Sequence, residues 1–235
     1  MCTVTYLPTQ EGGYILTSSR DERHHRGIAI PPRKYIVGNQ SLFYPKDPDK
    51  GGTWFATQAD GETLCLLNGA FQKHEPGKKY EVSRGVMLLE FFNYTSPEDF
   101  AAQYDFTPVE PFTLIFLKQR KLSVLKWDGE NTFLENLDPE IPAVWSSVTL
   151  YNEGVIRMRE EWFAQWLRQH SKFRQEEIMH FHRFGGEGDP ATDIRMSREG
   201  VVQTVSISSV EWKPDAVRLQ YDDLVNTRQY NIHVI

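Results

Sequence analysis

Apolar and polar positions alternate near both ends of the chain, as they do in β-strands that bury one face. Residues 2–7 and 14–20 follow this pattern on either side of a glycine-ended turn and predict a β-hairpin. Residues 54–59 and 62–67 predict a second hairpin around Asp60-Gly61, a pair suited to a type I′ turn. Further strands are expected at residues 112–118, 121–127, 143–148, 201–210, 216–221 and 229–234.

The two hairpins bring together residues that lie apart in the sequence. In the first, Cys2 would face Ser19, and Asp21 would lie beside the start of the chain, because directly opposed residues of an antiparallel pair have Cβ atoms about 4.5–5.5 Å apart. In the second, Thr53 would face Asn68 at the end of a strand.

The middle and late parts of the chain carry helical patterns. Residues 153–169 place apolar side chains along one stripe, which predicts an amphipathic helix packed across a sheet. Ser96-Pro97 has the form of an N-cap and a first-turn proline, so a short helix should begin there. Residues 173–184 are a further helical candidate, and the apolar run 86–92 fits a buried helix or a strand. Strands grouped around a helical centre predict a layered α+β fold, and we take residues 1–235 as one domain.

Composition narrows the classes of function. The chain has 32 acidic and 26 basic residues, a net charge of -6 and no long basic block, which argues against a nucleic-acid partner. No apolar run is long enough to span a bilayer and no secretory signal is readable, so we expect a cytoplasmic protein without membrane insertion. The only cysteines are Cys2 and Cys65, which argues against a disulfide framework.

Cys2 stands where removal of Met1 would leave a thiol beside a free α-amine. The ordinary pKa is about 7.7–8.0 for an α-amine and about 8.5 for a thiol, so the amine can accept the thiol proton near neutral pH. Nucleophile and base would then share one residue. Cysteine is also a small apolar residue that suits a buried first strand, and the sequence leaves that alternative open.

The pair Arg20-Asp21 carries the charges that such a terminus needs. A carboxylate can orient the α-amine, and a guanidinium can stabilise a thiolate or a developing negative charge. Residues 20–26 are all ionisable, and a run of this kind is also typical of a solvated loop. The hairpin distinguishes Arg20 and Asp21 from the rest of the run, because it brings them to Cys2.

Several of these residues together resemble a known family. Met1-Cys2-Thr3, followed by Ser-Ser-Arg-Asp-Glu at residues 18–22, is similar to the start of the NRDE family, the Transport and Golgi organisation 2 proteins. Gly-Gly-Thr-Trp at residues 51–54 and the later Asn68 match further landmarks of that family, and Arg195 fits its late arginine more loosely. The resemblance covers most of the chain and is sharpest in its first third.

That family in turn resembles the cysteine branch of the N-terminal-nucleophile hydrolases, which includes penicillin V acylase, bile salt hydrolase and acid ceramidase. The resemblance implies a four-layer αββα sandwich. We expect no metal or other cofactor. The resemblance also implies roles for five residues: Cys2 as nucleophile and base, Asp21 as the holder of the amine, Arg20 as a source of positive charge, Asn68 as an oxyanion donor and Arg195 in the charge network.

Two positions depart from the family pattern. Ser19 stands where the family has asparagine, and a serine lacks the pair of donors of the amide. Ser147 falls where the family often has asparagine and where the acylases place an oxyanion donor. Asn152 lies nearby and either replaces that donor or simply caps the following helix. Asn68 precedes a glycine, and Asn-Gly is also a common turn pair.

Other residues that could carry chemistry are interpreted as structural. His180 and His182 would point about 200° apart on a helix and could not chelate one metal ion. Cys65 alternates with apolar residues on a strand and is expected in the core.

Two hypotheses about function remain open. The first is an amidohydrolase that cleaves a linear carbon–nitrogen bond in a small-molecule acyl amide through a thioester intermediate. The second is a non-catalytic binding or carrier protein for a hydrophobic ligand, because relatives in the family are associated with haem or lipid handling and with secretory organisation. A homo-oligomer is compatible with both hypotheses.

Overall fold

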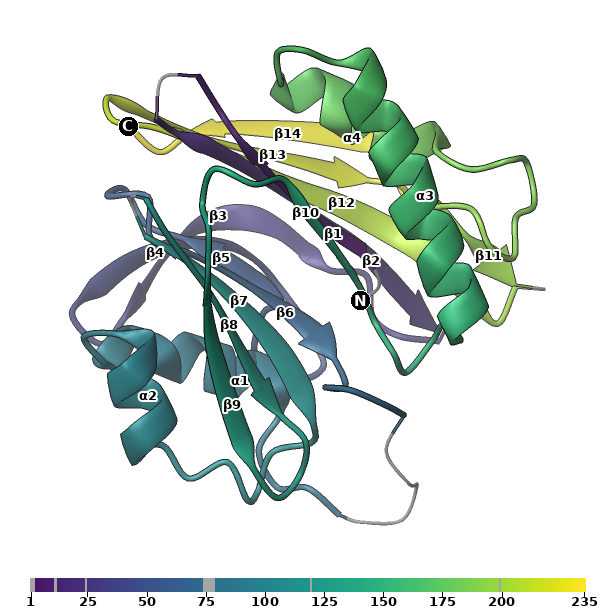
Figure 1. Ribbon diagram of the computed structural model, residues 1–235. Helices are drawn as coiled ribbons and strands as arrows, with labels where there is room; N and C mark the ends of the chain where they lie inside the picture. Colours follow the sequence, from purple (N-terminus) through teal and green to yellow (C-terminus); the bar gives the residue numbers. More distant parts are fainter. Residues whose placement is uncertain (1–2, 11, 24, 74–78, 119, 199) are drawn as a thin grey trace. The chain divides into compact units, whose positions relative to one another are not determined.

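The computed structural model describes residues 3–10, 12–23, 25–73, 79–118, 120–198 and 200–235 (Figure 1). The chain divides into two compact units that interleave along the sequence. The first unit comprises residues 1–26, 140–146 and 150–235, and the second comprises residues 27–139 and 147–149. Each unit contains one antiparallel sheet with helices, which is the expected α+β composition. That all 235 residues act as a single domain stays a prediction.

The first unit is built on a seven-stranded sheet in the order β10-β1-β2-β12-β13-β14, with β11 paired to β12. Helices α3 (Glu153–Gln169) and α4 (Gln175–Phe184) pack on this sheet (Figure 1). The strands are β1 (Thr3–Pro8), β2 (Tyr14–Arg23), β10 (Ala143–Ser146), β11 (Ser197–Arg198), β12 (Val202–Lys213), β13 (Ala216–Asp223) and β14 (Arg228–His233).

Helix α3 begins and ends where the sequence predicts. Its N-cap is Asn152, whose side chain accepts a hydrogen bond from the amide of Val155, which satisfies one of the free amides of the first turn. The apolar stripe, including Trp162 and Trp166, packs against Leu7 and Ile15 of the sheet in one buried cluster. The predicted packing of this helix across a sheet is confirmed.

The first hairpin is confirmed, but its register is one residue away from the expected one. Pro8, expected in the turn, belongs to β1 and pairs with Tyr14. The loop is closed between Thr9 and Gly13, where the amide of Thr9 donates to the carbonyl of Gly13 over 2.9 Å. Ser19 therefore faces Thr3, and its expected pairing with Cys2 is wrong.

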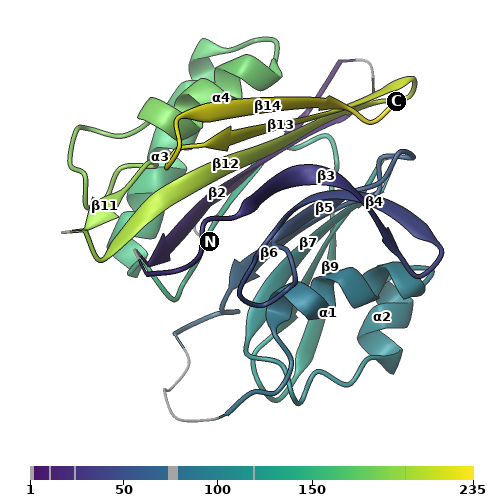
Figure 2. The same cartoon turned by 180° about the vertical axis from the view of Figure 1, so that it is seen from behind.

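The second unit is built on a seven-stranded sheet in the order β3-β4-β5-β6-β7-β8-β9. Helices α1 (Arg84–Glu90) and α2 (Pro97–Gln103) pack on it, joined through the 3-10 turn η1 (Phe91–Asn93) (Figure 2). The strands are β3 (Ile30–Val37), β4 (Gln40–Lys46), β5 (Phe55–Thr57), β6 (Thr63–Asn68), β7 (Phe112–Lys118), β8 (Lys121–Trp127) and β9 (Thr132–Leu137).

The second hairpin exists, but the expected two-residue turn is wrong. Its loop is closed between Gln58 and Glu62, with 2.9 Å between the Gln58 amide and the Glu62 carbonyl oxygen. Gly61 adopts φ 83°, a conformation that favours glycine and that occurs in hairpins with a bulged three-residue loop. The register shifts by one residue, so that Phe55 faces Cys65. The expected pairing of Thr53 with Asn68 is therefore wrong as well.

The sequence interpretation missed β3, β4, β9 and the short β11. Strand β3 contains Pro31 and Pro32, and its register is interrupted between Ile30 and Arg33. Proline is tolerated at a sheet edge because no ladder partner needs its amide, and β3 is an edge strand. No helix among the described residues is long and apolar enough to cross a membrane.

Candidate functional site

The beginning of β1 lies beside the later part of β2. Thr3 is the first described residue and pairs with Ser19, whereas Cys2, the expected nucleophile, lies outside the described residues. Asp21 follows Ser19 by two positions on the same face of β2, and only 2% of its surface is exposed. A buried carboxylate thus lies close to the N-terminal end of β1, as the hairpin predicted.

Two hydroxyl groups hold the carboxylate of Asp21. Tyr151 Oη donates to Oδ2 over 2.6 Å, and Thr204 Oγ1 donates to Oδ1 over 2.5 Å. Thr204 faces Asp21 across the pairing of β2 with β12, whereas Tyr151 precedes helix α3. Because both donors are neutral, these contacts orient the carboxylate without neutralising its charge.

Arg20 is also buried, but it projects from the opposite face of β2, because neighbouring residues of a strand alternate between faces. Its Nη2 lies 3.3 Å from Glu22 Oε2. On this face it also influences Tyr221, whose pKa is raised to about 12 by burial, against the opposing charge of Arg20. Arg20 and Asp21 therefore place opposite charges on the two faces of one strand.

Arg195, expected in the charge network, is exposed on the bend before β11 and forms no ion pair or side-chain hydrogen bond with any described residue. Arg198, three residues later, is the arginine that lies beside Tyr151. Its Nη1 donates to the carbonyl of Leu150 over 2.9 Å, and its guanidinium carbon lies 5.2 Å from the centre of the Tyr151 ring. The described contacts thus connect Arg198 to the tyrosine that holds Asp21.

Asn68 is the last residue of β6 and is half-buried. Its main-chain oxygen accepts a hydrogen bond of 2.7 Å from Ser147 Oγ. Its side-chain amide makes no hydrogen bond within the described part of the chain. Ser147, at the position where the family has a second asparagine, therefore supports the main chain of Asn68.

Asn152 is a helix cap, which is one of the two roles that the sequence left open. Its Oδ1 accepts from the Val155 amide over 3.0 Å. This contact makes Asn152 the N-cap of α3, which is a structural role.

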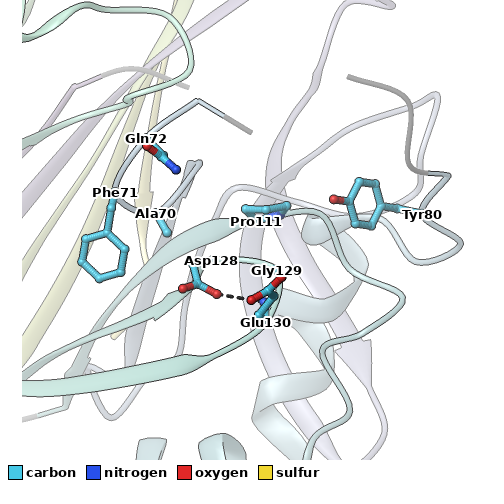
Figure 3. Close-up of a pocket in the computed structure, with 8 residues that line it drawn as sticks. All are labelled: Ala70, Phe71, Gln72, Tyr80, Pro111, Asp128, Gly129 and Glu130. Atoms are coloured by element: carbon cyan, nitrogen blue, oxygen red, sulfur yellow. Dashed lines mark hydrogen bonds between the residues drawn. The ribbon is translucent and has the colours of Figure 1, made fainter. Parts of the chain in front are cut away.

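The second unit contains a hollow of about 430 Å³ (Figure 3). Gly69, the residue before Ala70, adopts φ 81°, and its amide donates to the carbonyl of Pro111 over 2.9 Å. On the opposite side, Asp128 accepts a hydrogen bond from the Glu130 amide over 2.8 Å. The hollow is lined by Ala70, Phe71, Gln72, Tyr80, Pro111, Asp128, Gly129 and Glu130.

Ser19 has a partner that sequence reasoning missed. The imidazole of His182, on α4, lies between two hydroxyl groups: its Nδ1 is 2.8 Å from Ser19 Oγ and its Nε2 is 2.9 Å from Thr5 Oγ1. His182 is fully buried, and burial together with the charge of Arg159 lowers its pKa to about 3. The imidazole is therefore neutral and links α4 to β1 and β2. The hydroxyl of Ser19 pairs with one ring nitrogen of His182, so this contact does not require an amide side chain at residue 19.

Arg159 is a second residue that sequence reasoning missed. It lies on the apolar stripe of α3, four residues after Val155 and four before Phe163, and none of its surface is exposed. Its Nη1 donates to Thr3 Oγ1 over 2.5 Å, and its guanidinium carbon lies 3.7 Å from the centre of the Tyr151 ring. The sequence does show an arginine within an otherwise apolar helical stripe, and this pattern indicates a buried arginine with specific partners.

Within the described part of the chain, no group of three or more His, Cys, Asp or Glu side chains could hold a metal ion. Cys65 is fully buried in β6, as expected. The chemistry available at the described part of the site consists of an oriented carboxylate, several buried hydroxyl groups and three arginines.

The sequence matches the family model described as Transport and Golgi organisation 2 over residues 1–185. A search of curated proteins found no match.

Solved structures of amide hydrolases are similar to this chain along most of their length. A cysteine-to-alanine mutant of the conjugated bile acid hydrolase from Clostridium perfringens shares 12% identity and a TM-score of 0.63, covering 99% of this chain and 92% of that chain. A Caenorhabditis elegans N-acylethanolamine-hydrolyzing acid amidase ortholog shares 13% identity and a TM-score of 0.54, covering 91% and 93%. At this identity the likeness shows the fold alone. It confirms the expected fold class, the α+β sandwich of αββα type found in N-terminal-nucleophile hydrolases.

Proposed function

The chain belongs to the Transport and Golgi organisation 2 family, and from that premise we propose that it is a cysteine N-terminal-nucleophile amidohydrolase. Its substrate would be a small molecule in which an acyl group is joined to an amine by a linear amide bond. The similar structures are those of a conjugated bile acid hydrolase and of an N-acylethanolamine-hydrolyzing acid amidase ortholog. That pair of names supports an acyl-amide substrate class for this chain.

The reaction begins with removal of Met1, which frees the α-amine of Cys2. The amine accepts the thiol proton, and the thiolate attacks the carbonyl carbon to form a tetrahedral oxyanion. The carbon–nitrogen bond then breaks, the leaving amine takes the proton, and a thioester remains on Cys2. Water hydrolyses the thioester, which releases a carboxylic acid and restores the thiol. Asp21 would hold the α-amine, Arg20 would supply positive charge, and Asn68 would donate to the oxyanion.

The observation that carries this proposal is the setting of Asp21. Its carboxylate is buried beside the beginning of β1 and is oriented by Tyr151 and Thr204 at 2.6 and 2.5 Å. A buried carboxylate whose two oxygens accept from neutral hydroxyl groups is oriented to interact with a cationic group. The α-ammonium of a chain that starts at Cys2, one residue before Thr3, is such a partner.

The mass of the intact, untagged protein and the reactivity of its thiols test the proposal. We expect Met1 to be absent and Cys2 to react with iodoacetamide at pH 7 faster than Cys65, which is fully buried. A panel of fatty-acyl and bile-acyl amides of glycine and ethanolamine is then screened by mass spectrometry. Cys2→Ala should lower turnover by about a thousand-fold or more, whereas Cys65→Ala should not.

Two results would count against the proposal. A folded, active protein that retains Met1 rules out the α-amine as the base. Equal labelling of the two cysteines, with no acyl-amide turned over, favours a binding or carrier protein on the same fold.

A further inference from the structure

Arg159 is a buried cation without a carboxylate partner among the residues that the structure describes. None of its surface is exposed, and it forms no ion pair with any described residue. Its guanidinium instead donates to the main-chain carbonyls of Thr192 and Asp193 and to the hydroxyl of Thr3. These acceptors satisfy its donors but leave its positive charge in place, and such a charge is costly to bury.

Arg159 contacts two residues of the candidate site, Thr3 and Tyr151. One arm reaches Thr3, the residue that follows Cys2, over 2.5 Å. The flat face of the guanidinium lies 3.7 Å from the centre of the Tyr151 ring, a cation–π contact. The hydroxyl of the same tyrosine donates to Asp21 over 2.6 Å. One side chain thus connects the beginning of β1 with the residue that orients the carboxylate.

The influence of this charge is also visible at His182. The positive charge of Arg159 adds to burial in lowering the pKa of the imidazole. Arg159 therefore acts electrostatically on side chains that contact β1 and β2, beyond the atoms to which it is hydrogen-bonded.

We propose that Arg159 is an additional positioning residue of the site, which supplies buried positive charge at the beginning of β1 and holds Asp21 in place through Tyr151. This inference rests on the proposed function. In the attack step, a positive charge near Thr3 favours a thiolate at Cys2 over a thiol. The role differs from that of Arg20, which lies on the other face of β2.

The test compares how fast Cys2 reacts with two alkylating reagents of the same size and different charge, iodoacetate and iodoacetamide. The ratio of the iodoacetate rate to the iodoacetamide rate reports the electrostatic potential at the thiol. A merely structural role of Arg159 would leave this ratio unchanged. Mass spectrometry of peptides resolves Cys2 from Cys65. The variants are Arg159→Gln, which is neutral but keeps hydrogen-bond donors, and Arg159→Lys, which keeps the charge. Arg157→Gln, on the same helix with 75% of its side chain exposed, is the matched control.

We expect the ratio to fall about three-fold or more in Arg159→Gln and to stay near the wild-type value in Arg159→Lys and Arg157→Gln. A folded Arg159→Gln variant with the wild-type ratio overturns the proposal. An Arg159→Lys variant whose ratio falls as far as that of Arg159→Gln overturns it too. If the Gln variant does not fold, the wild-type protein is compared with a Cys-Thr-Val-Thr peptide. A wild-type ratio no higher than that of the peptide also overturns it.

The role of Arg159 and the proposed hydrolase function can fail independently in these measurements. The ratio of alkylation rates needs only the Cys2 thiol, so it can be measured in a protein that hydrolyses no amide. Loss of the effect of Arg159 in an active hydrolase removes Arg159 from the site and leaves the proposed function standing.

Discussion

The main chains of Gly52 and Gly85 are in contact. A Cβ atom placed on Gly52 would lie 2.2 Å from the carbonyl carbon of Gly85, and one placed on Gly85 would lie 2.7 Å from the carbonyl oxygen of Thr53. The amide of Thr53 donates to the Gly85 carbonyl over 3.0 Å, and Trp54 is buried. The Gly-Gly-Thr-Trp segment therefore serves the packing of the second unit, where it fixes the beginning of α1 against the sheet.

Gly52→Ala should destabilise the protein by about 3 kcal/mol, because the added methyl overlaps main-chain atoms that cannot move independently. Urea unfolding followed by circular dichroism measures the change. Gly154→Ala is the matched control, since this exposed glycine in the first turn of α3 leaves room for a Cβ 3.4 Å from Asn152 Oδ1. The control should be neutral or more stable by about 0.5–1 kcal/mol. Equal effects of the two substitutions would contradict the close approach of Gly52 and Gly85.

Ser19→Ala should cost about 1–3 kcal/mol of stability, because it leaves the Nδ1 of the buried His182 without its hydroxyl partner. Ser19→Asn, which restores the family residue, should be at least as costly because the larger side chain has to displace the imidazole. The control is Ser18→Ala, a buried neighbour whose hydroxyl contact, to the carbonyl oxygen of Ser19, is 3.4 Å long. If Ser19→Asn were as stable as the wild type, the imidazole could not lie where the structure places it.

The stability of the protein should fall as the pH falls from about 6.5 to about 3. The pKa of His182 is lowered from 6.5 to about 3 in the folded state, so between these values the unfolded chain binds the proton and the folded protein does not. Acidification therefore favours unfolding, by up to about 1.4 kcal/mol per pH unit from this group.

His182→Gln removes this titration and keeps a donor and an acceptor for Thr5 and Ser19. Unfolding free energies at pH 7, 6, 5 and 4 should show that the advantage of the wild type over this variant shrinks steadily with acidification. His233→Gln, on the exposed end of β14, should run parallel to the wild type. A constant difference between His182→Gln and the wild type across this range would show that folding does not lower the pKa of His182.

Asn68→Ala should lower kcat by about a hundred- to thousand-fold on any acyl-amide that the wild type hydrolyses, with a much smaller change in KM. Its stability should change little, because the hydrogen bond from Ser147 goes to the main-chain oxygen and survives truncation of the side chain. Asn152→Ala is the control: it should lose about 1 kcal/mol of stability as a removed helix cap, with kcat unchanged. An unchanged kcat in Asn68→Ala would remove this residue from the oxyanion site.

The parts of the fold that the sequence predicts well are those with local causes. Helix α3 has both expected ends because its cap and its apolar stripe lie within its own residues. Strands β7 and β8 also have the expected bounds, since each is a short segment in which buried apolar and aromatic residues predominate. Helix α2 starts at Pro97, after the predicted cap Ser96.

The errors lie where structure depends on loop geometry or on residues far apart in the chain. Both hairpin registers are one residue off. In the first hairpin, Pro8 extends β1 instead of starting the turn; in the second, a three-residue loop replaces the expected two-residue turn. The contact between Ser19 and His182 spans 163 positions, and its role could not be read from either residue alone. For the candidate site, the sequence predicts that Asp21 lies near the beginning of β1, but its two hydroxyl partners come from distant segments: Tyr151 precedes α3 and Thr204 lies in β12.

The pairing of β2 with β12 has a consequence for how the protein is made. Thr204 reaches Asp21 across 183 positions of sequence, so at a synthesis rate of about 5–20 residues per second the carboxylate waits roughly 10–40 s for that partner. During this time residues 27–139, which make up most of the second unit, have all left the ribosome's active centre. The first hairpin must therefore stay unaggregated with the edge of β2 open until the last quarter of the chain arrives, and the surroundings of Asp21 are completed late in biosynthesis.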